Sequence, residues 1–179
     1  AGIPSVVYGF FGLVVIVPMI RNYTAAQGIG GNGQTMLTAS IILGIMILPT
    51  IIGVTESAMR SVPDQYYEGS LALGATKERT IFRIVIPAAK SGVIAGIVLG
   101  IGRAIGETMA VIMVAGNQPR MPQGILEGVR TMTTNIVMEM GYAADLHREA
   151  LIATAVVLFV FILIINACVS LLNRRSEND

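Results

Sequence analysis

The sequence is poor in the residues that build soluble enzyme surfaces and metal sites. Only 13% of its 179 residues are charged, tryptophan is absent, and histidine and cysteine each occur once. Soluble globular domains carry about 25% charged residues, so a large water-facing surface is not expected. The lone cysteine, Cys168, excludes an internal disulfide and a cysteine-rich metal cluster, and it leaves the redox compartment open. The formal net charge of +1 gives no indication of nucleic-acid binding.

The sequence also lacks a nucleotide-binding loop. No segment fits the pattern G-x-x-x-x-G-K-[ST], and no glycine-rich loop follows a predicted strand. We therefore expect no ATPase activity and no bound cofactor in this chain, and we do not expect it to be an enzyme. The only histidine, His147, and the basic residue Arg120 lie in polar stretches where such side chains are usually solvated. Neither is a candidate site residue.

Apolar residues are what the chain has in quantity: they make up 54% of it and give a mean hydropathy of +0.72. Four stretches reach the roughly 20 residues that a helix needs to cross a bilayer, namely Ala1–Ile20, Thr35–Thr55, Ser91–Asn117 and Ala150–Leu172. The alternative is that these stretches are buried helices of a soluble protein. Four such stretches in so short a chain make this alternative unfavourable. Pro18 and Pro49 predict kinks that neighbouring helices cover. We expect one all-helical membrane bundle over residues 1–175, followed by a tail of residues 176–179.

The chain begins inside an apolar run, without an initiator methionine or a basic leader. We expect it to be a fragment whose upstream spans precede Ala1, rather than a chain that opens with a signal peptide.

Basic residues indicate which connections face the cytoplasm, because Lys and Arg concentrate on that side of a membrane. The segment Glu56–Lys90 holds a cluster of them, and Arg174 and Arg175 follow the last span. We therefore expect this segment and the C-terminus inside. The loops Arg21–Gln34 and Gln118–Glu149 should lie outside.

The second outer loop has a helical pattern. Apolar residues recur at helical spacing from Ile125 to Met140, between the prolines Pro119 and Pro122 and the glycine Gly141. The spacing predicts an amphipathic helix. Packing against the bundle and a contact with substrate both remain open as its role.

One inner segment carries a more specific pattern. Glu68-Gly69-Ser70-Leu71-Ala72-Leu73-Gly74-Ala75 is separated by nine residues after Gly74 from Ile84-Val85-Ile86-Pro87. We expect a helix over Pro63–Leu73, a turn at Gly74 that needs a conformation other residues resist, and a second helix over Lys77–Val85. The small side chains around the turn leave room for another protein, and Pro87 sets the start of the third span.

Two ionisable residues interrupt the third span. Arg103 lies about halfway along Ser91–Asn117, where a charge costs about 2.5–3.5 kcal/mol on insertion scales. In a continuous helix Glu107 lies one turn further on the same face, so the two can pair. The guanidinium suits oxyanions through paired hydrogen bonds. A transport site and a structural ion pair that locks two helices are both open.

The inner segment resembles the EAA loop of type I ABC importer permeases, in which EAA, three residues, G, nine residues and I-x-L-P follow one another. Gly69 and Ser70 replace the two alanines here, and Ile86 replaces the leucine. In that family the loop docks into a cytoplasmic ATPase subunit. The resemblance assigns ATPase coupling to six residues: Glu68, Gly69, Ser70, Ala72, Gly74 and Ala75.

The third span narrows the resemblance. Its string G-R-A-I-G-E-T-M-A-V over 102–111 is similar to the signature of the PstC family of phosphate-importer permeases, and residues 2–9 are similar to the start shared by PstC and PstA. The similarity extends to about Arg175 and implies a part in substrate translocation for Arg103, Glu107 and Thr108. Permeases of this family ordinarily have six spans, of which four are visible.

The resemblance implies a MetI-like permease fold in the cytoplasmic membrane of a prokaryote, surrounded by membrane lipid. The implied partners are a PstA-like second permease, a dimer of ATPase subunits that binds ATP-Mg, and an extracytoplasmic phosphate-binding protein. Three alternatives stay open. The first alternative is a permease for another oxyanion such as sulfate or molybdate. The second is the PstA-like subunit of the same transporter, and the third is a membrane scaffold that transports nothing.

Overall fold

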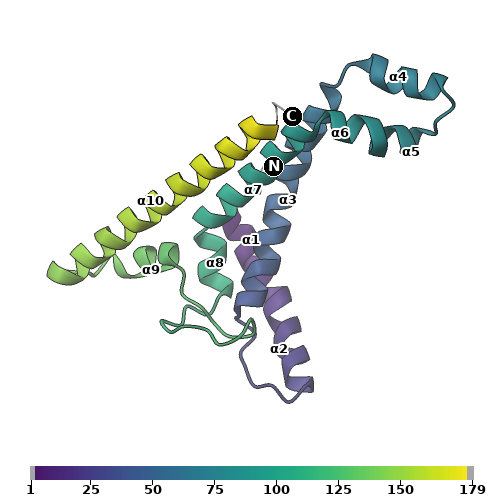
Figure 1. Ribbon diagram of the computed structural model, residues 1–179. Coiled ribbons are helices and arrows are strands. Elements are labelled where there is room, and N and C mark those ends of the chain that lie inside the picture. Colours follow the sequence, from purple (N-terminus) through teal and green to yellow (C-terminus); the bar gives the residue numbers. More distant parts are fainter. Residues whose placement is uncertain (1–2, 177–179) are drawn as a thin grey trace. The chain divides into compact units, whose positions relative to one another are not determined.

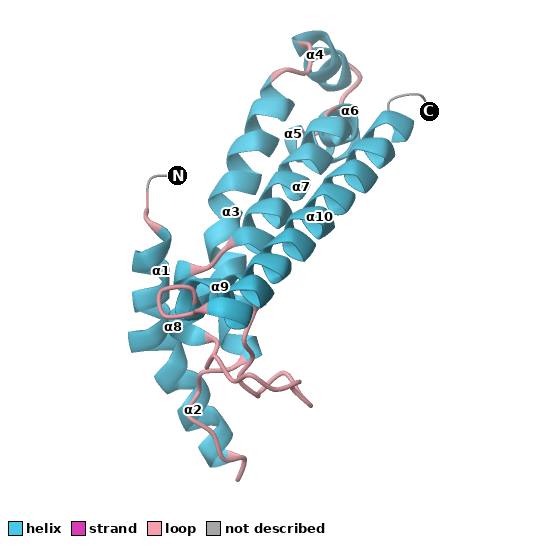
Figure 2. Ribbon diagram, turned by 90° about the vertical axis from the view of Figure 1, so that its left-hand side faces the viewer, coloured by secondary structure: helices cyan, strands magenta, loops and turns pink. Residues whose placement is uncertain are grey.

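The computed structural model describes residues 3–176, which form helices and loops without any named strand (Figure 2). The all-helical prediction is confirmed for these residues. The predicted tail of residues 176–179 lies outside the described residues except for Ser176. Within the described part, three helical stretches are long and apolar enough to cross a membrane, and a bent pair makes a fourth if it is one span. The three are Ser5–Ala26, Met36–Arg60 and Asp145–Cys168, and the pair is Lys77–Ala88 with Lys90–Gly106.

The chain divides into two compact units, which are described separately below. Unit 1 combines Ala1–Met46 with Arg103–Ile164, and unit 2 combines Ile47–Gly102 with Ile165–Asp179. Three long helices run through both units, namely α3 (Met36–Arg60), α7 (Lys90–Gly106) and α10 (Asp145–Ser176). The expectation of a single transmembrane domain stays a prediction.

The first span is helical throughout, but its middle is wound more widely. It consists of α1 (Ser5–Phe11), the π-helical turn η1 (Gly12–Ile16) and α2 (Val17–Ala26). The Val17 N–H donates to the Gly12 carbonyl, five residues back. Pro18 follows directly, and proline has no N–H to continue an α-helical ladder. A π turn absorbs such an interruption without breaking the helix.

The same device precedes Pro87. The helix α5 (Lys77–Thr80) continues as the π turn η2 (Ile81–Val85) and then as α6 (Ile86–Ala88), and the Ile86 N–H donates to the Ile81 carbonyl. After a break at Ala89, α7 leaves at an angle of 74° to the preceding helix. The proline thus lies just before the start of the third span, as expected.

The core of unit 1 forms around α8 (Met109–Val114), which packs against α1 and the first turns of α3. Glycines allow this close approach. A Cβ at Gly9 would lie 2.9 Å from the Ala110 Cα, and one at Gly12 would lie 2.8 Å from the Ile42 Cγ1. The buried apolar residues of this core are Val17, Ala39, Ile42, Ala110, Val111, Val114 and Ala115.

The third predicted span is not one helix, and this corrects the sequence-based expectation. The helix α7 ends at Gly106, Glu107 and Thr108 are not helical, and α8 begins at Met109. The Glu107 N–H closes the last turn on the Ala104 carbonyl at 3.2 Å. Glycine weakens a helix interior by about 1 kcal/mol relative to alanine, and three glycines lie between residues 100 and 106. Arg103 and Glu107 are therefore not related by one turn of a continuous helix.

In unit 2, glycines at every fourth position of α7 face α3. A Cβ at Gly96 would lie 3.2 Å from the Val54 Cβ, and one at Gly100 would lie 2.7 Å from the Ile51 Cγ1. Small residues at this spacing let helix backbones approach in membranes. Beyond them, α4 (Asp64–Ala72) and α5 run side by side and are joined by a short loop (Figure 1). We call α4, this loop, α5 and η2 the elbow.

The amphipathic helix predicted from Ile125 to Met140 is only half present. Residues from Met132 to Glu139 form α9, and those before Thr131 are irregular. The reason is tertiary hydrogen bonding: the Ile125 and Glu127 carbonyls accept the Leu37 and Met36 N–H groups at the start of α3, both at 2.8 Å. These bonds satisfy donors that a helix start leaves unpaired.

The last span is longer than its apolar run. Helix α10 begins at Asp145, five residues before the predicted start at Ala150, and its described part continues to Ser176. A helix can begin with a charged turn that precedes its apolar, membrane-spanning stretch. The length of the apolar stretch alone therefore does not reveal where the helix begins.

Candidate functional site: a coupling elbow and a broken span

The glycine of the inner motif closes α4 in a specific geometry. Gly74 has φ of 85°, in the left-handed region. Its N–H donates to the Leu71 carbonyl at 2.9 Å, and the Ala75 N–H donates to the Ser70 carbonyl at 3.2 Å. This is the Schellman arrangement, in which a glycine just after the helix end satisfies its last carbonyls. The helix–glycine–helix prediction is confirmed, with α4 and α5–η2 close to the predicted ranges.

The structure divides the six predicted coupling residues into two groups. Glu68, Gly69, Ala72 and Gly74 are exposed, whereas Ser70 and Ala75 are half-buried. Leu73 continues the exposed group and is 91% exposed, an unusual state for a large apolar side chain outside a predicted span. We call Glu68, Gly69, Ala72 and Leu73 the outer face of α4.

On its other side α4 carries Tyr67, Ser70 and Leu71, at the spacing of one helix face. The Ser70 hydroxyl lies 2.9 Å from that of Thr80, a fully buried residue at the end of α5. Sequence analysis did not single out Thr80, and no pattern indicates a partner ten residues away. Thr76 begins α5 by accepting the Arg79 N–H on its hydroxyl at 3.3 Å.

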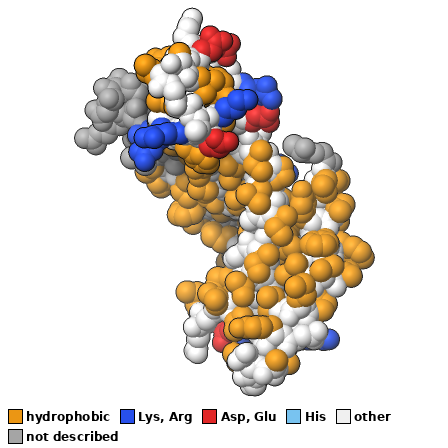
Figure 3. Space-filling view, turned by 90° about the vertical axis from the view of Figure 1, so that its right-hand side faces the viewer, with side chains coloured by type: hydrophobic (Ala, Val, Ile, Leu, Met, Phe, Trp, Pro, Cys, Tyr) orange, Lys and Arg blue, Asp and Glu red, His pale blue; other side chains and the backbone are white. Residues whose placement is uncertain are grey.

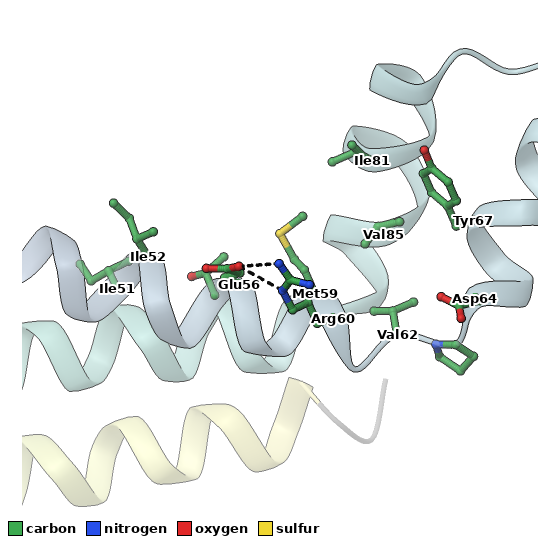
Figure 4. A pocket seen from close by; sticks show the side chains of 12 residues that line it. Ile51, Ile52, Glu56, Met59, Arg60, Val62, Asp64, Tyr67, Ile81 and Val85 are labelled. Atoms are coloured by element: carbon green, nitrogen blue, oxygen red, sulfur yellow. Dashed lines mark hydrogen bonds and ion pairs between the residues drawn. The ribbon is translucent and has the colours of Figure 1, made fainter. Parts of the chain in front are cut away.

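A cavity of about 850 Å³ opens at the base of the elbow. It lies between the end of α3, the first turns of α4 and η2, and its lining is mainly apolar (Figure 4). Tyr67 and Asp64 reach it from α4, and Ile81 and Val85 from η2. At its edge Arg60 donates to Glu56 at 2.9 Å, an exposed pair on one helix face.

Charge marks the elbow as a water-facing part of unit 2. Lysine, arginine and acidic side chains gather over it on the face that Figure 3 presents. All of Glu68, Lys77, Glu78, Arg79 and Arg83 are exposed. A segment so charged is unsuited to the hydrocarbon of a bilayer.

In unit 1 the break between α7 and α8 holds the other three candidate residues. Arg103 lies in the last turn of α7, where the negative end of the helix dipole favours a cation. Glu107 is half-buried, and its carboxylate Oε1 accepts the Ala110 N–H of α8 at 3.1 Å. The Thr108 hydroxyl donates to the Gly106 carbonyl at 3.4 Å. The part of these residues in translocation stays a prediction.

A second cavity, of about 290 Å³, adjoins Glu107. We call residues 118–149, which the sequence predicts to lie outside, the outer segment. The polar lining of the cavity comes from Glu107, Ser40 and two threonines of this segment, Thr131 and Thr133. The Thr133 hydroxyl donates to the Glu107 carbonyl at 3.4 Å. The outer segment therefore reaches the break in the span. Sequence analysis left two roles open for this segment, packing against the bundle and a contact with substrate.

The outer segment is itself fastened by an ion-pair network. Arg130 donates to the Glu139 carboxylate at 2.9 Å and to the Asn117 carbonyl at 3.0 Å, and both charged side chains are about four-fifths buried. His147 Nε2 lies 3.8 Å from the same carboxylate. Desolvation and then the hydrogen bond with Glu139 raise the pKa of Tyr142 above its ordinary 10.0. Among the described residues, no group of three or more His, Cys, Asp or Glu side chains could hold a metal ion.

Comparison with known proteins places the chain in a family. The family model described as binding-protein-dependent transport system inner membrane component matches residues 1–178. A probable ABC transporter permease protein, YqgH of Bacillus subtilis, is 42% identical over 170 residues, which are 92% of this chain and 54% of the relative. A phosphate transport system permease protein PstC of Xylella fastidiosa is 38% identical over 176 residues, covering 89% of this chain and 54% of the relative.

A further PstC, from Pasteurella multocida, is 32% identical over 192 residues, covering 99% of this chain and 60% of the relative. The chain thus spans little more than half the length of the curated relatives it matches. No solved structure matches it significantly.

The family match, the helical architecture and the membrane-span candidates confirm the expected MetI-like permease fold. The chain belongs to the family of binding-protein-dependent transport system inner membrane components.

Proposed function

We propose that this chain is part of a permease subunit of an ATP-driven importer and that its cargo is inorganic phosphate. The observation that carries the proposal is the elbow: a thin, water-facing helix closed by Gly74, with its outer face exposed and apolar Leu73 at its end. The names of the PstC relatives support phosphate as the cargo. Arg103 and Glu107, at a break in a membrane-spanning segment, support a path for an anion.

In this proposal the elbow and the C-terminus lie in the cytoplasm, and the segment from Gln118 to Glu149 faces outward. A dimer of ATPase subunits binds ATP-Mg and pushes on the outer face of α4. A PstA-like permease completes the pathway, and an extracytoplasmic phosphate-binding protein delivers the anion. The chain itself binds no cofactor. Arg103, Glu107 and Thr108 offer the passing anion a transient site.

The cargo is tested by uptake into proteoliposomes that hold the full-length permease with its second permease, ATPase and binding protein. We expect ATP-dependent uptake of labelled phosphate that excess unlabelled phosphate suppresses and that sulfate or molybdate leaves unchanged. Saturable sulfate uptake that phosphate does not affect would contradict phosphate as the cargo. Absence of any ATP-dependent uptake by an intact complex would favour a scaffold.

The coupling function is tested by Glu68→Lys, which reverses a charge on the outer face of α4. We expect normal membrane insertion and a fall in uptake of at least about tenfold, which corresponds to about 1.4 kcal/mol of lost interaction. Glu78→Lys is the matched control, because Glu78 is also exposed but lies on α5. If both variants transport like the wild type, the outer face does not contact the ATPase.

A further inference from the structure

Ser70 and Thr80 make a contact that the coupling motif does not explain. Their hydroxyl oxygens lie 2.9 Å apart, although the residues are ten positions apart in sequence. Thr80 is fully buried and Ser70 is half-buried, so the bond is shielded from water. In the described part of the chain, it is the one side-chain hydrogen bond between α4 and another element.

Apart from this bond, α4 is held by its chain connections and by contacts with α5 and η2. Its first turns border the cavity of about 850 Å³ rather than a close-packed neighbour. Its outer face is exposed, including Leu73 at 91%. On the inner side Tyr67 lines this cavity together with Ile81 and Val85 of η2, but apolar contacts are non-directional and do not fix an orientation. A hydrogen bond between two side chains fixes both distance and direction.

One path from α4 to the candidate membrane spans leads back through residues 61–63 into α3, and the other leads through Thr80. This residue ends α5 and is followed without a break by η2 and α6, which lead through the 74° bend into α7. A displacement of α4 can reach α7 through the loop at Gly74, through the contacts of α4 with η2, or across the Ser70–Thr80 contact. The loop is held at Gly74 by backbone hydrogen bonds alone, and the Ser70–Thr80 bond adds a direct side-chain link between α4 and α5.

We propose that the Ser70–Thr80 hydroxyl pair is the positioning contact that makes α4 and α5 move as one lever during transport. Ser70 then faces inward and does not touch the ATPase, in contrast to the part that the motif resemblance assigns to it. The proposal rests on the proposed function, because a lever has a use only if a partner pushes on the outer face of α4.

A stability measurement alone would not test the pair. Without Ser70, the Thr80 hydroxyl can donate to the carbonyl four residues back in its own helix, as threonines in helices commonly do. The informative quantity is the coupling ratio, the number of phosphate ions imported per ATP hydrolysed, measured on the complete transporter in proteoliposomes. A side chain with a purely structural part changes the amount of folded complex and leaves this ratio unchanged.

Ser70→Ala and Thr80→Val each remove one hydroxyl and keep the shape of the site. We expect each to lower the coupling ratio by about fivefold to tenfold, the scale of one hydrogen bond, while the ATPase still co-purifies. The double variant should be no worse than either single one, because all three remove the same bond. Thr80→Ser should restore the ratio. Thr76→Ala is the matched control, since that hydroxyl caps α5 without joining it to α4.

A covalent lock gives an independent arm. Ser70→Cys with Thr80→Cys, in a Cys168→Ser background, should form a disulfide on oxidation. The state reduced with dithiothreitol lacks the hydroxyl hydrogen bond and should show the lowered coupling ratio, whereas the disulfide of the oxidised state should restore the ratio if α4 and α5 move as one lever. Loss of transport on oxidation that reduction reverses would overturn the proposal, because the elbow would then have to flex.

Two other results would overturn the inference while leaving the proposed function intact. One is an unchanged coupling ratio in both single variants. The other is loss of ATPase co-purification with Ser70→Ala but not with Thr80→Val, which would place Ser70 at the ATPase surface. Failure of the proposed function looks different, because the wild-type complex itself would then import no phosphate.

Discussion

Arg103→Gln is expected to lower ATP-dependent phosphate uptake by at least about tenfold, since a charge-assisted hydrogen bond contributes about 1.5–3 kcal/mol. Glutamine keeps a polar, though shorter, side chain and removes the positive charge. A charge in a membrane-spanning segment is costly, which makes Arg103 a candidate for a functional part. The measurement is initial uptake rate in proteoliposomes, normalised to the amount of assembled complex.

Companion variants separate charge from structure at this site. Arg103→Lys keeps the charge and loses the planar fork, so we expect intermediate uptake. Glu107→Gln keeps an oxygen that can still accept the Ala110 N–H, so it tests the carboxylate charge while sparing the start of α8. Arg120→Gln is the matched control, because that side chain is exposed on the outer segment. Normal uptake by both Arg103→Gln and Glu107→Gln would make the two residues structural.

Gly9→Val is expected to destabilise the folded protein by about 3 kcal/mol, the upper range for overpacking a close contact. A Cβ at this position would lie 2.9 Å from both the Ala110 Cα and the Met113 Sδ. The methionine sulfur can move aside, but the α8 backbone cannot move without disturbing the break at Glu107. The measurement is the midpoint of thermal unfolding of the detergent-solubilised full-length protein, together with its yield as a monodisperse species.

Gly44→Val serves as the control for this substitution. Gly44 lies inside α3, and a Cβ there meets no heavy atom within 4 Å. Replacing a helical glycine where space is free is neutral or slightly stabilising, because glycine is a poor helix former. Equal unfolding midpoints for the two variants would contradict a close approach of α1 and α8.

The elbow was predictable because its signals are local. Gly74 takes a backbone conformation that suits glycine, and Pro87 interrupts a helical ladder wherever it occurs. Each of these residues affects only the few residues next to it. The helix–glycine–helix element and the start of the third span can therefore be predicted from the local sequence. The direction in which Ser70 points was not predictable, because its partner Thr80 is identified only when α4 and α5 fold together.

The broken span shows the opposite case. Apolarity from Ser91 to Asn117 is continuous apart from two charges, and it favours one helix. The structure instead ends α7 at Gly106, where the Glu107 carboxylate turns to the Ala110 N–H and α8 packs against α1 through Gly9. Contacts between segments about one hundred residues apart leave no periodic trace in the sequence.

The sequence by itself determined an all-helical membrane bundle, because span length, low charge and turn residues are properties of short segments, and the permease family followed from the resemblance of its motifs. Tertiary structure alone decided three things: where the third span breaks, which half of the outer segment is helical, and which of the predicted coupling residues face inward. Each depends on hydrogen bonds or close contacts between distant segments. Such contacts compete with local helix propensity, and only the folded chain shows which of them prevails.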